Sequence, residues 1–491
     1  MLFNSFIFLA FLVVVVAATT ALRHPRARAL FLLLASYAFY AYWDWRFIAL
    51  LVVATVIDYA IGRKLGDTQD AGIRRRLLLL SCLSNLGMLV FFKYFNFFAE
   101  GAQAAAASVG WHVESWQLRI ALPLGISFYT FRTLSYIIDV YRRRLTPTNS
   151  LVDYALFVSF FPMLVAGPIE RAGNLLPQFA NLKSPSREQI REGLVLIALG
   201  YFKKVLIGDA AGRVVDSVFG QPELYRSPEL LAALLLFSIQ LYADFAGYSN
   251  IARGVARLVG VDLMKNFEQP YLSRSFSEFW RRWHISLSRW IWDYLFAPLI
   301  SAVLRVISRL RLPTVEQEMR LAYPLAVITT MLLCGLWHGA GYTFLVWGGM
   351  HGIFLAFERL VIYRGRPIPM QRRIRGITGR LRFVTELVTT QAFVVLGWLF
   401  FRADDMDQAR YILRQFVHWQ GSELTGRFAF MVLVYALVVL LLDLVEYRTK
   451  SETYLLRLRP AVTVGICTAT MLVVCLYLAT TKPLPFVYFQ F

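Results

Sequence analysis

Hydrophobic residues fill long stretches of this chain, and short polar segments separate them. A helix that crosses a membrane needs roughly 20 mostly apolar residues, because its backbone polar groups must be satisfied within the segment. The pattern therefore predicts an all-α, polytopic integral membrane protein with roughly 10–13 transmembrane or re-entrant helices. The predicted segments are 3–22, 29–43, 47–62, 77–98, 118–140, 151–167, 190–208, 229–247, 321–337, 342–360, 384–401, 426–446 and 461–480.

Segments 29–43 and 151–167 are short or contain a proline, so half-helices or re-entrant segments are expected there. No internal repeat separates the chain into halves. We expect a single membrane domain over 1–491, with N-terminal helices in 1–260, interfacial or re-entrant helices in 261–320, and the remaining helices in 321–491.

Segment 262–300 has a different pattern, because it is long enough to span but carries many charges. Between Ser277 and Tyr294, large apolar side chains recur at helical spacing while polar side chains share another side. This predicts one amphipathic helix at the membrane surface, and no clear span over 262–320. His284 lies on that helix, and a purely interfacial role does not require it.

Composition and charge agree with a membrane protein, since 58% of residues are hydrophobic and 17% charged. The net charge of +20 comes from basic residues in short loops, such as 23–28, 63–76 and 142–144, and from eight arginines in 359–382. The positive-inside rule explains this distribution without a nucleic-acid partner. It predicts cytoplasmic positions for these loops and a periplasmic N-terminus. The first 22 residues have no basic region before their apolar core, so we interpret them as the first span.

Two histidines stand in the apolar segment GLWHGAGYTFLVWGGMHG at 335–352: His338 and, thirteen residues later, His351. An ionisable group in such surroundings usually faces a cavity or a pathway, although a histidine can also serve as an interhelical hydrogen-bonding group. Their separation exceeds three helical turns, so the two rings are not expected to touch. The glycines around His338 either allow close helix approach or leave open space beside its ring. We therefore favour His338 over His351 as the functional residue.

Eight motifs occur along this chain in a fixed order: MLFNSFIFLAFL at 1–12, FFKYFNFF at 91–98, LPLGISFYTFRTLSYIIDVYR at 122–142, FFPMLVAGPIER at 160–171, LYADFAGYSNIARGVARLVG at 241–260, FWRRWHISLSRW at 279–290, LWHGAGYTFLVWGGMHG at 336–352 and GWLFFRADDMDQA at 397–409. Taken together and in this order, they resemble the motifs of the membrane-bound O-acyltransferases, and in particular those of the bacterial alginate O-acetyltransferase branch.

The resemblance implies acyl transfer, with His338 of the WHG motif as the essential catalytic residue and His284 at the family's upstream polar position. Imidazole chemistry agrees, because a base is needed to take the proton of a hydroxyl acceptor, and a reference pKa near 6.5 suits that task. No GxSxG or HExxH motif indicates a serine nucleophile or a zinc site. The further candidates for a substrate tunnel or donor site are Trp337, Trp283, Arg282, Asp244, Tyr248 and His351.

The expected architecture is a ring of tilted helices around a thinned centre with a catalytic tunnel. No bound cofactor is expected. The expected donor is acetyl-CoA or another acetyl thioester, because cytoplasmic arginines attract its phosphates. An exported polysaccharide, a periplasmic acetyltransferase partner and membrane lipid are the other expected partners, at the bacterial inner membrane. Two alternatives remain: a carrier of a lipid-linked or anionic solute without chemistry, and an acyltransferase acting on a lipid or a protein.

Overall fold

The computed structural model describes residues 1–110 and most of 111–491, with gaps at 112–117, 119–120, 311, 365–375 and 490–491. Every regular element within the described residues is helical, which confirms the all-α prediction. The chain forms two compact units. The first comprises 1–201, 248–264 and 459–485, and the second comprises 202–247, 265–458 and 486–491. The expectation of one domain over 1–491 stays a prediction.

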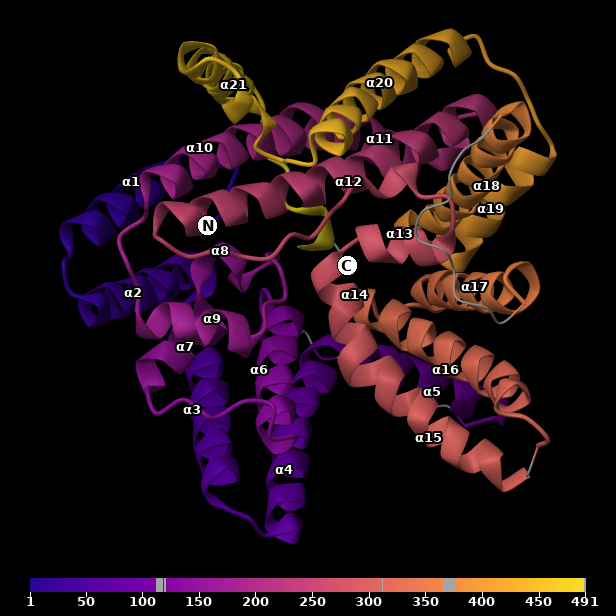
Figure 1. Ribbon diagram of the computed structural model, residues 1–491. Coiled ribbons are helices and arrows are strands. Elements are labelled where there is room, and N and C mark those ends of the chain that lie inside the picture. Colours follow the sequence, from indigo (N-terminus) through magenta and orange to yellow (C-terminus); the bar gives the residue numbers. More distant parts are fainter. Residues whose placement is uncertain (112–117, 119–120, 311, 365–375, 490–491) are drawn as a thin grey trace. The chain divides into compact units, whose positions relative to one another are not determined.

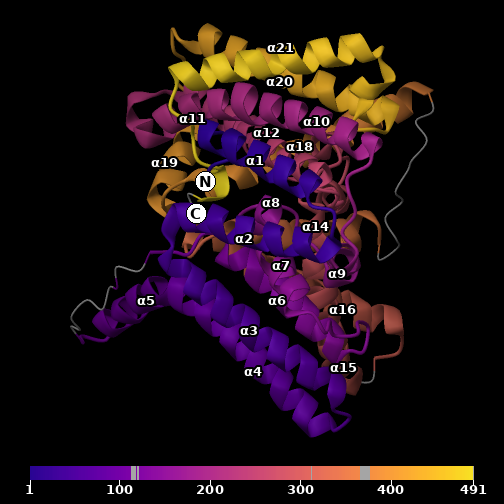
Figure 2. The same ribbon diagram turned by 90° about the vertical axis from the view of Figure 1, so that its left-hand side faces the viewer.

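The first unit contains the N-terminal helices. In Figures 1 and 2, α3 and α4 run antiparallel to each other, joined by a short turn. Its helices are α1 (Phe6–Ala21), α2 (Pro25–Asp44), α3 (Arg46–Asp67), α4 (Ala71–Leu89), α5 (Phe95–Ser108), α6 (Ile126–Tyr141), α7 (Leu151–Ser159), α8 (Phe161–Leu164), α9 (Ala172–Ala180), α10 (Arg187–Tyr201) and α21 (Pro460–Thr480), with the π-helix η1 (Val90–Tyr94) joining α4 to α5.

The second unit contains all the residues of the central histidine motifs. Its helices are η2 (Phe202–Asp209), α11 (Ala210–Gly220), α13 (Phe276–Arg282), α14 (Ile285–Ile291), η5 (Trp292–Phe296), α15 (Ala297–Ile307), α16 (Val315–His338), α17 (Tyr342–Phe357), η7 (Glu358–Ile362), α18 (Gly376–Arg402), α19 (Met406–Val417), α20 (Thr425–Thr449) and η9 (Val487–Phe489). Helix α12 (Ser227–Leu258) begins in this unit and ends in the first.

Eight helices among the described residues are long and apolar enough to cross a membrane, and the shorter α1 is also apolar. They confirm a multi-pass membrane protein and cover 71–108, 227–258, 285–310, 315–338, 342–362, 376–402, 425–449 and 460–480. Segments 3–22, 29–43, 47–62 and 190–208 lie in helices that are shorter, interrupted or more polar. Segment 118–140 includes residues 119–120, which lie outside the described residues, and its later part forms α6. Segment 151–167 is broken into the short α7 and α8, as its proline predicts.

The prediction for 262–320 was wrong in two respects. The expected continuous helix from Ser277 to Tyr294 is broken, because α13 ends at Arg282 and α14 begins at Ile285. Residues 285–310 then form a helix apolar enough to span, although no span was expected there. Within 262–300, seven charged residues precede His284 and two follow it, so an average over that segment hides its apolar second half.

Candidate functional site

His338 is the last residue of α16, and only 4% of its surface is exposed. Aromatic rings surround its imidazole, with ring-centroid distances of 4.7 Å to Trp337, 5.0 Å to Trp347, 5.1 Å to Phe401 and 5.4 Å to Tyr488. Such edge-to-face contacts hold an aromatic ring in a defined orientation. The imidazole therefore lies in a dense apolar surrounding, at the point where the helix ends.

Glycines determine how closely α16 and α17 pack. A Cβ atom on Gly335 would collide with the carbonyl oxygen of Phe344, and one on Gly348 would collide with the carbonyl oxygen of Met331. The two helices therefore approach backbone to backbone, as small residues allow in membrane helices. Of the two expectations for these glycines, close approach is correct at Gly335 and Gly348, and open space is wrong there.

His284 occupies the junction between α13 and α14 and is fully buried. Its backbone is left-handed, with φ 41° and ψ 56°, a conformation that residues other than glycine rarely adopt and that costs about 1–3 kcal/mol. Asn266 holds the next turn, since its carbonyl oxygen accepts from Ile285 N (2.8 Å) and its Oδ1 accepts from Ser286 N (3.2 Å). The surrounding chain thus fixes a bend that local propensity disfavours.

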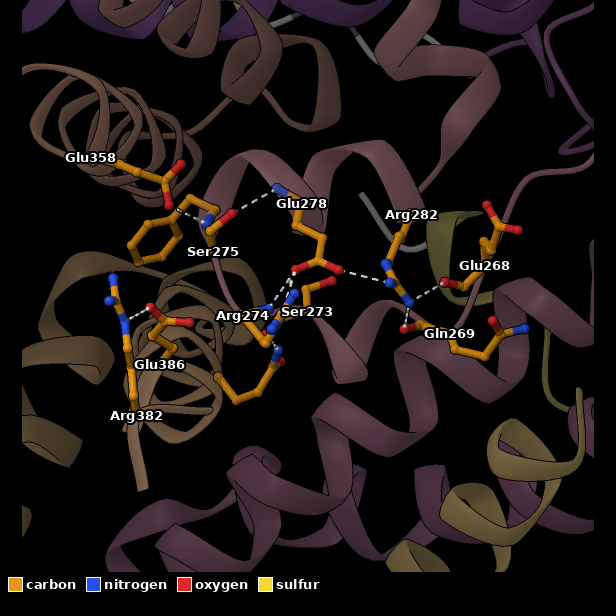
Figure 3. A network of polar contacts seen from close by, with 12 residues as sticks. Glu268, Gln269, Ser273, Arg274, Ser275, Glu278, Arg282, Glu358, Arg382 and Glu386 are labelled. Carbon is orange, nitrogen blue, oxygen red and sulfur yellow. Dashed lines mark hydrogen bonds and ion pairs between the residues drawn. The ribbon is translucent and has the colours of Figure 1, made fainter. Parts of the chain in front are cut away.

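A polar network fixes α13, which leads into this bend (Figure 3). The carboxylate of Glu358 accepts from the backbone N–H groups of Phe276 (3.0 Å) and Ser277 (2.9 Å) at the start of the helix. A carboxylate at a helix N-terminus satisfies unpaired N–H groups and complements the helix dipole. The orientation of α13 is therefore set at its first turn.

Arg282, a predicted donor-site residue, belongs to the same network. Its Nη2 lies 2.7 Å from Oε1 of Glu278, and its Nη1 approaches the carbonyl oxygens of Glu268 and Gln269 at 3.4 and 3.5 Å. These contacts tie the end of α13 to the preceding loop. A role for Arg282 toward a donor stays a prediction.

The imidazole of His284 packs edge-on against Phe245 at 4.6 Å and lies 6.4 Å from both Trp337 and Tyr488. Neither ring nitrogen has a hydrogen-bond partner within the described part of the chain. Burial lowers the pKa of His284 to about 3, because desolvation disfavours the imidazolium. The ring is therefore neutral over the physiological range and has two uncommitted nitrogens.

The structure brings His284 and His338 into one aromatic cluster, because Trp337 and Tyr488 neighbour both rings. His351 joins the same cluster through Trp347, which lies 4.9 Å from it. Trp283 forms another part of the wall, 5.1 Å from both Phe267 and Trp398. Four of the predicted site residues therefore belong to the aromatic cluster that contains His338: Trp337 directly, His284 and His351 through shared ring neighbours, and Trp283 through Trp398, which lies 5.4 Å from Phe401.

Tyr488 is the residue that sequence reasoning missed. It lies beyond the last predicted span, in the aromatic run PFVYFQF at 485–491, and its ring neighbours both histidines. A cluster of aromatic side chains after the final apolar helix was the available signal. Nothing in the spacing along the chain connects that run to residues 284 and 338.

Asp244 and Tyr248 lie on α12 but have different surroundings. Asp244 is buried and lies 2.6 Å from Nζ of Lys204. Tyr248 belongs to the first unit, where its ring stacks on Phe3 at 4.5 Å. Their proposed roles toward a donor stay predictions.

No group of three His, Cys, Asp or Glu side chains within the described ranges is arranged to hold a metal ion. The reactive groups that the cluster contains are the imidazoles of its histidines. An unprotonated imidazole can take a proton from a hydroxyl group placed beside it.

Comparison with known proteins assigns this arrangement to a family. The model of the membrane-bound O-acyltransferase family matches residues 142–400, a range that contains both α13 and the α16–α17 pair. This chain belongs to the membrane-bound O-acyltransferase family. The family resemblance stated from the motifs is thereby confirmed, and the chain is a membrane-bound acyltransferase.

Individual relatives extend the match over most of the chain. A probable alginate O-acetylase AlgI of Pseudomonas syringae pv. tomato is 38% identical over 468 residues, covering 92% of this chain and 84% of the relative. The protein of the same description from Azotobacter vinelandii is 40% identical, covering 83% and 76%. A peptidoglycan O-acetyltransferase of Helicobacter pylori is 33% identical, covering 82% and 76%.

Proposed function

We propose that this protein takes an acetyl group from a cytoplasmic thioester, such as acetyl-CoA, and passes it across the bacterial inner membrane for O-acetylation of an exported polysaccharide such as alginate. One observation carries the proposal: two buried histidines from separate segments share Trp337 and Tyr488 as ring neighbours. The descriptions of the relatives, which name alginate and peptidoglycan acetylation, support the acetyl group and the polymer acceptor.

His338 acts as the general base in this proposal. As the acceptor oxygen attacks the thioester carbonyl, its proton moves to the imidazole, the new C–O bond forms and the C–S bond breaks. The imidazolium then returns the proton to the departing thiolate. A thioester and a hydroxyl thus give an ester and a thiol, with no net proton change. The rings of Trp347 and Phe401 around His338 exclude water, which limits hydrolysis of the thioester.

His284 has a different role, because burial lowers its pKa to about 3 and makes it a weak base. With one nitrogen protonated, it can donate a hydrogen bond to the oxygen that becomes negative during attack, or it can orient the thioester. Its strained backbone supports such a role, since strain of this kind concentrates at functional positions. The bend held by Asn266 fixes the imidazole beside Phe245 before the substrate arrives.

The direction of transfer follows from the charge distribution along the sequence. Arginine-rich loops place the phosphate-bearing donor on the cytoplasmic side, and the N-terminus is then periplasmic. The acceptor is reached from the opposite side, either directly or through a periplasmic acetyltransferase partner. Trp337, Trp283, Arg282, Asp244, Tyr248 and His351 remain the candidates for the path between the two.

The test uses purified full-length protein with acetyl-labelled acetyl-CoA and, in parallel, alginate oligosaccharides, peptidoglycan fragments or phospholipid. We expect label in an ester of a polysaccharide and none in phospholipid. His338→Ala should abolish that label while the protein remains monodisperse. Label that crosses a vesicle membrane without forming an ester would support the carrier alternative. An ester formed only on lipid or on protein would show that the acceptor is not a polysaccharide.

A further inference from the structure

A short segment at 486–489 places Tyr488 in the histidine cluster. Phe486 and Val487 are each 1% exposed, and the single turn η9 carries Tyr488. The ring of Tyr488 lies 5.4 Å from that of His338 and 6.4 Å from that of His284. No helix longer than this turn holds the segment, so its position depends on contacts with the rest of the second unit.

Asp244 on α12 makes the polar contact with this segment. Its Oδ2 accepts a hydrogen bond of 2.7 Å from the backbone N–H of Val487, while its Oδ1 lies 2.6 Å from Nζ of Lys204. Lys204 also lies 2.5 Å from Oδ1 of Asp209. The side chains of all three ionisable residues are at most 3% exposed. One ammonium therefore faces two carboxylates in a buried site, and the Val487 N–H supplies a further donor.

Close packing surrounds this group of charges. Lys204 and Asp209 lie on the π-helix η2, and the same helix brings Gly208 against α12. A Cβ atom on Gly208 would lie 3.0 Å from the backbone nitrogen of Asp244, so the glycine favours this close approach. The next residue of α12, Phe245, has ring neighbours in both Phe486 (5.2 Å) and His284 (4.6 Å).

We propose that Asp244 is a positioning residue that, oriented by Lys204, holds segment 486–489 so that Tyr488 stays beside His284 and His338. A buried carboxylate with two partners is costly to disturb, because removing one partner leaves a desolvated charge uncompensated. Asp244 thus acts on the reaction through the backbone of Val487. This inference rests on the proposed acyl transfer, and it adds a residue that positions part of the reaction centre.

The experiment is a double-mutant cycle on the hydrogen bond itself. Asp244→Ala removes the acceptor, and Val487→Pro removes the donor, because proline has no N–H and is tolerated at the first residue of a helical turn. Each change should lower kcat by about 10²-fold, with KM for the donor changed far less, because a small displacement of a positioned group affects chemistry most. The double variant should lose no more than either single variant.

Matched controls separate this bond from packing and from charge. Val487→Ala keeps the N–H and should keep kcat. Asp209→Ala removes the other carboxylate on Lys204 but no contact with Val487 that the structure records, so its loss should be smaller than that of Asp244→Ala. Asp244→Glu, which keeps two oxygens, should restore part of the loss. Multiplicative losses in the double variant, or equal losses in Asp209→Ala and Asp244→Ala, would overturn the proposal.

A second readout does not depend on activity. In a background with alanine at the four cysteine positions, Phe486→Cys reports the position of the segment through its reaction with N-ethylmaleimide. The thiol should be protected with Asp244 present and should react at least about tenfold faster after Asp244→Ala or Val487→Pro, because local opening exposes it. Unchanged protection would overturn the inference. Changed protection in a protein that transfers no acetyl group would instead overturn the proposed function alone.

Discussion

Two buried polar groups in this chain, one in each unit, are held in opposite ways. In the first unit, Asp58 on α3 is fully buried, and both carboxylate oxygens accept hydrogen bonds, from Ser81 Oγ (2.6 Å) and Asn85 Nδ2 (2.8 Å). In the second, both nitrogens of the equally buried His284 lack a partner among the residues that the structure describes. The carboxylate of Asp58 is satisfied by hydrogen bonds within the protein, whereas the ring nitrogens of His284 remain able to bind a substrate.

This difference distinguishes buried polar residues that stabilise helix packing from those that are candidates for a catalytic role. Polar side chains that satisfy one another across helices, such as Asp58, Asn85 and Thr133 on α3, α4 and α6, stabilise helix packing. Buried groups whose hydrogen-bonding capacity is not used within the chain are costly and therefore informative. Burial alone would rank Asp58 and His284 equally as functional candidates.

The largest expected effect is in the histidine cluster. His338→Ala should lower kcat by about 10²–10⁴-fold, because it removes the general base. Membrane insertion and the chromatographic profile should match those of the wild type, since one ring is lost from an aromatic wall that remains. Acetyl transfer to the polysaccharide measures the result. Wild-type turnover in this variant would remove His338 from the mechanism.

Asp58→Ala should have the opposite profile. The donors of Ser81 and Asn85 would be left without their acceptor in a buried site, which costs about 1–3 kcal/mol per group. The thermal midpoint of unfolding in detergent should fall, while kcat per folded molecule stays at the wild-type value. A selective loss of kcat with unchanged stability would place Asp58 among the functional residues and end the comparison.

His284→Asn isolates the imidazole from the backbone. Asparagine tolerates the left-handed conformation, so the bend should persist and stability should change little. Turnover should fall by about 10–100-fold because a positioned hydrogen-bond donor is lost. His284→Val provides the contrast, since a β-branched residue at this φ should reduce stability as well. Equal stability losses in both variants would indicate that His284 mainly supports packing.

The stability of the wild type should decrease as pH falls below about 6.5. An unfolded chain binds a proton at His284 near that pH, whereas the folded protein keeps the ring neutral until its pKa of about 3. The pKa is lower in the folded state, so acid favours unfolding. From this residue the free energy of unfolding should drop by about 2 kcal/mol between pH 7.5 and 5. His284→Asn should show a correspondingly smaller drop, and an identical drop would contradict the burial argument.

The smallest effects are expected at His24 and His418, which lie outside the histidine cluster. His24 precedes α2, and His418 follows α19; both side chains are exposed. Alanine at either position should change the free energy of unfolding by no more than about 0.5 kcal/mol. It should leave kcat close to the wild-type value. They also serve as matched His→Ala controls for position 338. A large loss of acetyl transfer in either variant would mean that the reaction centre lies elsewhere.

Helix content and membrane location followed from the sequence because long apolar runs have few alternatives in lipid. Segments 229–247, 342–360 and 426–446 each fall within one of the apolar helices of the structure. The predicted continuous helix from Ser277 to Tyr294 was wrong because the left-handed backbone of His284 interrupts it. Apolar spacing contains no information about a bend at one residue that Asn266 stabilises from outside the helix.

The all-α membrane class, the family and the two leading histidine candidates could be predicted from the sequence, because hydrophobic runs and ordered motifs are properties of the chain alone. The position of Tyr488 beside both His284 and His338, and the hydrogen bond between Asp244 and the segment that carries Tyr488, could be seen only in the folded protein. Such contacts join residues far apart along the chain. Their partners are selected by packing and by the need to satisfy buried charge, which no local pattern records.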